Sequence, residues 1–205
     1  METRDANLRA FAEKQIQDSC DIKRRLDSSL LDKLCSIAER TADILLAGGC
    51  VFFCGNGGSA GDAQHLAAEF VGRFQGERGA LPALSLATNV SLLTAVANDY
   101  GYEHIFSRQI EALAKSGDIL FLISTSGNSK NVLLAAEKAR AQGIFTVGLT
   151  GATGGHLRDA VDLLINVPSS DTQRIQETHI LLGHIYCGAV ELAITSRKRQ
   201  HAAST

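Results

Sequence analysis

The sequence has few of the residues that mark linkers, disulfide frameworks or charged binding surfaces. Its 205 residues include only two prolines, which excludes a proline-rich linker. The five cysteines are an odd number and form no C-x-x-C pair, so we assign them no role. Lysine and arginine number 20 against 22 aspartates and glutamates, a net charge of −2. This balance provides no attraction toward nucleic acid or an anionic membrane, and we expect neither as a partner.

The sequence also lacks a recognisable targeting segment. Residues 1–9 carry charges of both signs and no apolar stretch, unlike a secretory signal. The apolar runs are far shorter than the ~20 residues that cross a bilayer. We therefore expect a cytoplasmic protein. At roughly 150 residues per domain the chain is one domain, and a chain of this size folds without a disulfide or a metal.

The first 48 residues have the apolar spacing of helices. Between Asp5 and Ala47 apolar residues recur mostly every three or four positions, which predicts two helices. Asp27-Ser28-Ser29 is suited to a break and an N-cap between them. We assign 1–48 to the same domain as the rest and expect it to form part of a subunit contact.

After Gly49 short strand-like runs alternate with helical ones. The strand candidates are residues 50–54, 83–86, 118–123, 144–149 and 162–167. The helix candidates are residues 60–74, 90–97, 103–114, 130–142 and 172–197. This alternation predicts an α/β fold: a doubly wound, parallel, five-stranded, flavodoxin-like sheet with helices on both faces, spanning 49–197. Residues 198–205 are expected to be a frayed tail. Ligands of such folds bind at the carboxyl ends of the strands.

Two polar loops follow predicted strands at that edge. Gly55-Asn-Gly-Gly-Ser-Ala60 lets the backbone approach a ligand and leads into a helix N-terminus, which favours an anion. It matches G-x-G-x-x-A, but Glu77, the acidic residue at the right spacing, lies in a Gly- and Arg-rich loop, so the dinucleotide interpretation is weak. No G-K-[ST] follows, which excludes a P-loop for nucleoside triphosphates.

The second loop, Ser124-Thr-Ser-Gly-Asn-Ser129, presents four hydroxyl groups before a helix. Hydroxyls and helix N–H groups bind phosphate without any lysine or arginine. Helix capping by Ser129 would explain one hydroxyl but not four. We therefore predict a phosphate site.

Histidine and carboxylate side chains mark two helices. His65 and Glu69 are four residues apart and share a helix face, although an ordinary solvated Glu69–Arg73 pair would give the same pattern. The last helix is apolar nearly all round and must be buried. It contains Gln176 and His184, about 12 Å apart along its axis. Spacing alone favours a hydrogen-bonded core histidine for His184. His104, His156, His179 and His201 are given structural roles.

Three runs of residues carry a family resemblance. Residues 54–65 (CGNGGSAGDAQH), 124–129 (STSGNS) and 174–179 (RIQETH) resemble the phosphoheptose isomerase family, part of the sugar-isomerase (SIS) group of phosphosugar-binding domains. The resemblance extends over residues 5–195. The STSGNS loop indicates only the wider group, whereas its combination with His65, Glu69, Gln176 and His184 indicates the isomerase.

The resemblance implies roles for individual residues. Residues at the sugar phosphate would be Asn56, Gly57, Gly58, Ser59, Glu69, Asn98, Asp99, Ser124, Thr125, Ser126, Ser129, Asp171 and Gln176. One Zn²⁺ per subunit would be held by His65, Glu69, Gln176 and His184. Glu69 and His184 would form the acid/base pair, with either one acting on carbon.

The resemblance also implies an activity and an assembly. The family interconverts D-sedoheptulose 7-phosphate and D-glycero-D-manno-heptose 7-phosphate through an enediol. This is the first step toward the heptose of bacterial lipopolysaccharide or another surface glycan. We expect a homotetramer, since one small domain leaves part of the apolar last helix uncovered. Two alternatives stay open: a non-catalytic SIS adaptor of the type that binds a replication initiator, which would lack the carboxylate and imidazole, and an isomerase for another phosphosugar.

Overall fold

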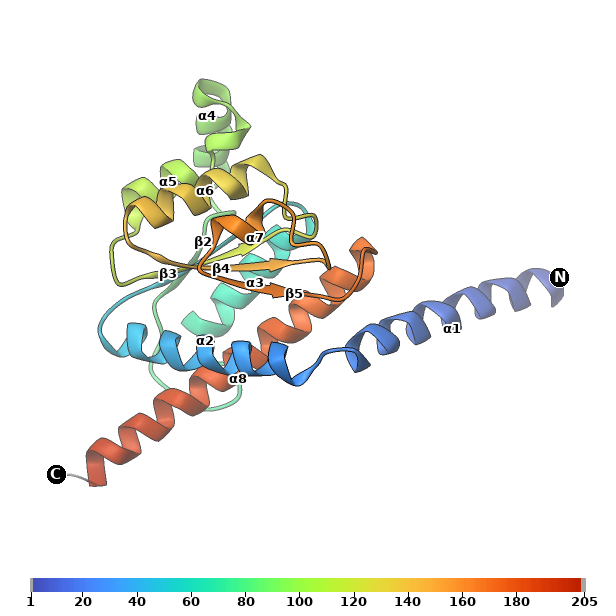
Figure 1. The fold of residues 1–205 in the computed structure, drawn as a ribbon, viewed down its shortest axis with the longest axis horizontal. Coiled ribbons are helices and arrows are strands. Elements are labelled where there is room, and N and C mark those ends of the chain that lie inside the picture. Colours follow the sequence, from blue (N-terminus) through green and yellow to red (C-terminus); the bar gives the residue numbers. More distant parts are fainter. Residues whose placement is uncertain (1, 204–205) are drawn as a thin grey trace.

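A single parallel sheet organises the chain. The computed structural model describes residues 2–203 and is drawn in Figure 1. Its five strands lie in the order β2-β1-β3-β4-β5 and every neighbouring pair is parallel. The strands are β1 (Val51–Gly55), β2 (Ala83–Ser85), β3 (Ile119–Ile123), β4 (Phe145–Thr150) and β5 (Leu163–Asn166). This order confirms the predicted doubly wound, flavodoxin-like α/β fold.

Helices cover both faces of this sheet, as predicted. They are α1 (Glu2–Arg24), α2 (Ser28–Leu46), α3 (Gly58–Val71), α4 (Val90–Tyr100), η1 (Tyr102–His104), α5 (Ser107–Leu113), α6 (Lys130–Ala141), α7 (Leu157–Ala160) and α8 (Thr172–Ala203). One apolar core joins α2, α3 and α8 to the sheet, and the other joins α5, α6 and α7 to its opposite face. Successive strand residues point to opposite faces, so Phe53 lies in the first core and Phe52 in the second. Both faces of β1 and β3 are therefore buried, which explains their uninterrupted apolar sequences.

The N-terminal helices differ in how much of them is buried. The Asp27 carboxylate accepts a hydrogen bond from the Leu30 N–H at 2.8 Å, which confirms the predicted N-cap of α2. Helix α2 packs along α8, and a buried hydrogen bond joins Tyr186 Oη to Thr41 Oγ1 at 2.9 Å. Helix α1 projects from the body of the molecule (Figure 1) and leaves Phe11 and Ile16 exposed.

Two predicted boundaries are wrong. The helix predicted over 103–114 is divided into η1 and α5, because the chain turns at Ile105–Phe106 and buries both side chains. Helix α8 continues to Ala203, so residues 198–203 are helical and not a frayed tail, while residues 204–205 lie outside the described residues. Arg197 forms ion pairs with Glu39 and Asp43 of α2, which support this end of α8.

Helix α8 has one property that the sequence analysis did not anticipate. Its residues Thr172–Arg199 are long and apolar enough to cross a membrane by length and composition alone. Half of its most apolar window is buried inside the chain, against α2, α3 and the sheet. A helix buried in a protein core meets the same criterion. Burial against α2, α3 and the sheet therefore accounts for the apolar composition of α8.

Candidate active site

The two polar loops start side by side. Strands β1 and β3 are neighbours and are paired to their ends, where Gly55 lies opposite Ile123. In the first loop Asn56 exchanges two amide hydrogen bonds with Asn131 of α6, at 2.9 and 2.8 Å. The Tyr102 hydroxyl also donates to Asn56 Oδ1 at 3.0 Å. The first loop is thus tied to the helix that begins after the second loop.

The start of α3 is shaped for close approach. Gly57 adopts a φ of +57°, which a residue with a side chain rarely adopts, and Gly57 and Gly58 are exposed. A Cβ atom on Gly58 would lie 2.7 Å from Nε2 of Gln176, a half-buried residue of α8. Ser59 is buried behind them. The predicted residues of the first loop therefore meet Gln176 at the N-terminus of α3.

The second loop directs the hydroxyl groups of Ser124 and Ser129 toward each other, whereas Thr125 and Ser126 line a cavity. Ser129 occupies the N-cap position of α6, but within the described chain its side chain makes no capping hydrogen bond. Its Oγ instead lies 3.1 Å from Ser124 Oγ. The alternative explanation of Ser129 as a simple helix cap therefore does not hold.

A cavity of about 260 Å³ adjoins this loop. Its polar lining comes from the loop itself, from the loop after β4, and from the segment that leads into α8: Thr125, Ser126, Asn128, Thr153, Ser169, Ser170 and Thr172. The glycine-rich loop after β4 closes one side, because a Cβ atom on Gly127 would collide with the Gly154 carbonyl. The result is a hollow with many hydroxyl groups at the carboxyl edge of the sheet.

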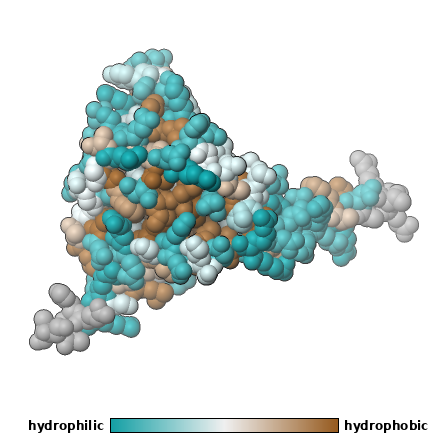
Figure 2. Space-filling model, viewed as in Figure 1, coloured by the Kyte–Doolittle hydropathy of each residue, from teal (hydrophilic) through white to brown (hydrophobic). Residues whose placement is uncertain are grey.

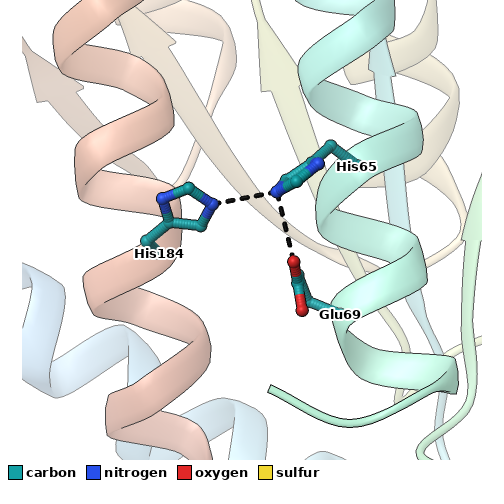
Figure 3. Close-up of side chains that lie close together, drawn as sticks. All are labelled: His65, Glu69 and His184. Atoms are coloured by element: carbon teal, nitrogen blue, oxygen red, sulfur yellow. Dashed lines mark hydrogen bonds and ion pairs between the residues drawn. The ribbon is translucent and has the colours of Figure 1, made fainter. Parts of the chain in front are cut away.

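Helices α3 and α8 bring three predicted site residues together. His65 Nε2 lies 2.9 Å from Nε2 of His184 and 3.2 Å from Oε1 of Glu69. Figure 3 shows these side chains pointing toward one another from the two helices. Arg73 pairs with Glu77 at 3.5 Å, so the alternative Glu69–Arg73 pair is not formed. Gly183 allows the close approach of the helices, since a Cβ atom there would lie 2.6 Å from a methyl carbon of Leu66.

This cluster has the composition of a metal site. One ligand atom from each of His65, Glu69 and His184 lies within 4.8 Å of the others. Two imidazole nitrogens and one carboxylate oxygen are a donor set found in catalytic zinc sites, which keep another position open. The side chain of His65 is 50% exposed and that of Glu69 22%, so a small molecule can reach the cluster. The fourth residue predicted as a metal ligand is Gln176, and its side chain lies beside Gly58 at the start of α3.

Other predicted residues lie elsewhere in the chain. Asn98 and Asp99 are exposed on α4, where the Asn98 amide donates to Asp99 Oδ1 at 2.8 Å. Within the described chain α4 buries none of its residues, and it stands out from the body in Figure 1. Asp171 precedes α8, and its Oδ1 accepts the Gln173 N–H at 2.9 Å, as a helix-capping carboxylate does. A single chain does not bring Asn98 and Asp99 to the cluster.

Sequence reasoning missed Asp62, three residues before His65 on α3. Burial raises the pKa of its carboxyl to about 6, although the nearby His65 opposes the shift. Its buried Oδ2 has no hydrogen-bond partner among residues 2–203. The three-residue spacing from His65 was the available signal, since residues at i and i+3 share a helix face.

Comparisons with known proteins identify the family of the chain. A family model described as SIS domain matches residues 16–151. A phosphoheptose isomerase of Rhodospirillum rubrum is 52% identical over 187 residues, covering 90% of this chain and 100% of that protein. One from Roseiflexus sp. is 52% identical over 177 residues, covering 86% and 90%. The solved phosphoheptose isomerase GmhA of Neisseria gonorrhoeae superposes with a TM-score of 0.85 at 41% identity, covering 90% of this chain and 98% of that one. The chain belongs to the phosphoheptose isomerase family of SIS-domain proteins.

Proposed function

We propose that this chain is an aldose–ketose isomerase that converts D-sedoheptulose 7-phosphate to D-glycero-D-manno-heptose 7-phosphate. The observation that carries the proposal is the convergence of His65, Glu69 and His184 at an accessible position. The relatives at 52% identity, which are named phosphoheptose isomerases, support the substrate. In this role the enzyme is cytoplasmic and performs the first step toward the heptose of a bacterial surface glycan.

The phosphate end of the substrate fits the second loop. Ser124, Ser126 and Ser129 supply hydroxyl groups, and α6 supplies the N–H groups of its first turn. A helix N-terminus favours an anion because its N–H groups are unpaired and its dipole is positive there. The phosphate is therefore held without a lysine or arginine.

The reacting end of the sugar fits the cluster on α3 and α8. Isomerisation moves one proton between C1 and C2 and a second proton between their oxygens. It needs a base near the carbons and an acid near the oxygens. The Glu69 carboxylate and the His184 imidazole converge on His65 from different helices, so they can serve the two positions. The non-catalytic SIS adaptor would have no use for this pair, and the chain retains both residues.

A divalent metal fits beside them. His65, Glu69 and His184 would hold Zn²⁺, and Gln176 is proposed as the fourth ligand, one ion per subunit. Bound Zn²⁺ would polarise the sugar carbonyl as a Lewis acid. We expect a chelator to abolish turnover and added Zn²⁺ to restore it, with metal content measured on the same samples. Full turnover by metal-free protein would contradict the metal site.

The proposed enzyme is a homotetramer whose sites are completed between subunits. The projecting α1 exposes Leu8, Phe11 and Ile16, and an apolar patch lies on this helix in Figure 2. Helix α4 also exposes Val90 and Tyr100. A second copy that covered these helices would bring Asn98 and Asp99 of one subunit toward the cluster of another.

The direct test is to incubate the protein with sedoheptulose 7-phosphate and follow the appearance of an aldose phosphate. Fructose 6-phosphate, a shorter ketose phosphate, tests the alternative of another phosphosugar. Conversion of the heptulose phosphate with little conversion of the hexulose phosphate supports the proposal. The reverse preference would assign a different substrate, and no turnover of either would favour a binding module.

A further inference from the structure

One carboxylate of α8 holds the loop 72–82 that joins α3 to β2. Glu191 Oε1 accepts the Phe74 N–H at 3.0 Å and the Arg78 Nε–H at 2.6 Å. Its Oε2 accepts the N–H groups of Gln75 at 3.1 Å and Gly76 at 3.4 Å. Burial by itself would raise the pKa of Glu191, but these hydrogen bonds and the charge of Arg78 outweigh it and lower the pKa. The ionised Glu191 carboxylate therefore anchors the loop through four hydrogen bonds.

Arg78 extends the anchor to the end of α3. Its Nη2 donates to the backbone carbonyl of Glu69 at 2.6 Å, and its Nη1 donates to that of Phe70 at 2.8 Å. The last carbonyls of a helix lack partners within the helix, so a guanidinium there satisfies and fixes them. The Arg78 side chain is 14% exposed and that of Glu191 12%, which places the pair away from bulk solvent. The backbone of Glu69 is thereby linked through Arg78 to α8.

Phe74, which belongs to the same loop, packs against His184. The two rings stack with centroids 5.7 Å apart and planes inclined by 20°. Gly188, one turn after His184 on α8, leaves the space for Phe74: a Cβ atom there would lie 3.3 Å from Cε1 of the ring. The His184 imidazole therefore has Phe74 as one neighbour and Nε2 of His65, at 2.9 Å, as another.

We infer that Phe74, Arg78 and Glu191 are positioning residues for the Glu69–His184 pair. The Arg78–Glu191 ion pair holds the loop, Arg78 fixes the backbone at Glu69, and Phe74 fixes the plane of the His184 imidazole. The contacts of Arg78 and Phe74 reach the two residues proposed to move protons, and Glu191 holds both Arg78 and Phe74 in place. A loop anchored only for stability would not require this. The catalytic consequence rests on the proposed function, whereas the fixed orientation of the imidazole does not.

The first test reads the orientation without any turnover. The stacked Phe74 ring leaves the His184 imidazole one orientation beside His65. Imidazole NMR should therefore show one sharp set of signals for His184. Phe74→Leu should split or broaden these signals, and Phe74→Tyr, which keeps the ring face, should restore them. Phe145→Leu is the matched control, because Phe145 of β4 is also a half-buried phenylalanine, and its ring stacks with Arg40 of α2 and packs against the core. Unchanged signals in Phe74→Leu would overturn the inference.

The second test measures kcat and KM of the isomerisation. Loss of partners that orient catalytic side chains typically costs 10–100-fold. We expect Phe74→Leu and Glu191→Gln to lower kcat by about that factor while KM changes less than about twofold. Arg197→Lys is the control for Glu191→Gln, since Arg197 pairs with α2 from the same helix. A fall in melting temperature with kcat unchanged would assign the anchor to stability alone and overturn the inference.

The two tests also separate this inference from the proposed function. Sharp imidazole signals that Phe74→Leu disturbs, in a wild-type chain with no isomerase activity, would contradict the function and support the positioning. Normal wild-type activity, together with undisturbed imidazole signals in Phe74→Leu, would support the function and contradict the positioning. If Phe74→Leu does not fold, Glu191→Gln decides through the same two measurements.

Discussion

Glu69 faces His65, although its own helix offers Arg73 as a partner one turn later. The distance to His65 Nε2 is 3.2 Å, and the Glu69 side chain is only 22% exposed. A solvated helix-surface pair of the kind that Glu69 and Arg73 could form contributes a few tenths of a kcal/mol at most. His65 also lies one turn away on α3, so the carboxylate is directed to the His65–His184 cluster and not to Arg73.

Replacing Glu69 by glutamine should abolish its action as a base while keeping its size. General acid/base groups typically contribute about 10²–10⁴ in rate, so kcat should fall by at least that factor with a much smaller change in KM. Metal content must be measured on the same variant, because Glu69 is also a proposed metal ligand. Arg73→Gln is the control on the same helix, and near-normal turnover by Glu69→Gln would defeat the assignment.

His179 illustrates a histidine with a structural role. Burial lowers the pKa of its imidazole to about 4, although a hydrogen bond to the Thr150 carbonyl opposes the shift. In the unfolded chain a histidine has a pKa of about 6.5. Between these values the unfolded state binds more protons than the folded one, so the free energy of unfolding should fall as the pH is lowered from about 6.5 toward about 4.

The slope from this one group approaches 1.4 kcal/mol per pH unit within the window. His179→Gln keeps a donor for the Thr150 carbonyl but does not titrate. Urea unfolding at several pH values should therefore show a shallower pH dependence for the variant than for the wild type. Equal slopes in the two proteins would contradict the assigned role of His179.

At the scale of elements, the site depends on where strands end and helices begin. The hydroxyl groups of the second loop follow β3, and α6 starts at Lys130 without a side-chain cap from Ser129. Ser129→Ala should therefore weaken substrate binding, by about 1–3 kcal/mol, without unfolding α6. Ser116→Ala is a matched control, since Ser116 is exposed at the opposite end of the same strand. Equal KM values for wild type and Ser129→Ala would show that the hydroxyl does not bind phosphate.

At the scale of the whole molecule, two helices remain incompletely covered. Helix α1 projects with Leu8 and Ile16 about two-thirds exposed, and α4 contributes no buried residue to the described chain. Apolar surface of this kind marks a contact with another chain. Light scattering at micromolar concentration should give the mass of a tetramer, four times 21.8 kDa. Phe11→Glu should shift the mass toward smaller species and lower activity with it, whereas a monodisperse wild-type monomer would refute the assembly.

Much of the architecture could be predicted from local patterns. Five apolar runs alternating with helical spacing predict a parallel sheet, because central strands such as β1 and β3 are buried on both faces and each crossover between parallel strands needs a helix. The Asp27 cap and the loop after β3 could also be predicted, because each of them is formed by a few consecutive residues. The helix predicted over 103–114 failed because burial of Ile105 and Phe106 depends on a distant surface.

The sequence alone determined the fold class, the two loops at the carboxyl edge and the shared face of His65 and Glu69. Only the tertiary structure decided that His184, 119 residues after His65, lies 2.9 Å from it. It also decided that Phe74 stacks on His184, and that Arg78, paired with Glu191, binds the backbone carbonyl of Glu69. Periodicity reports which residues share a face of one helix, whereas the distance between residues of α3 and α8 is set by how the two helices pack. That packing depends on small residues such as Gly183, whose importance becomes visible only once the partner helix is in place.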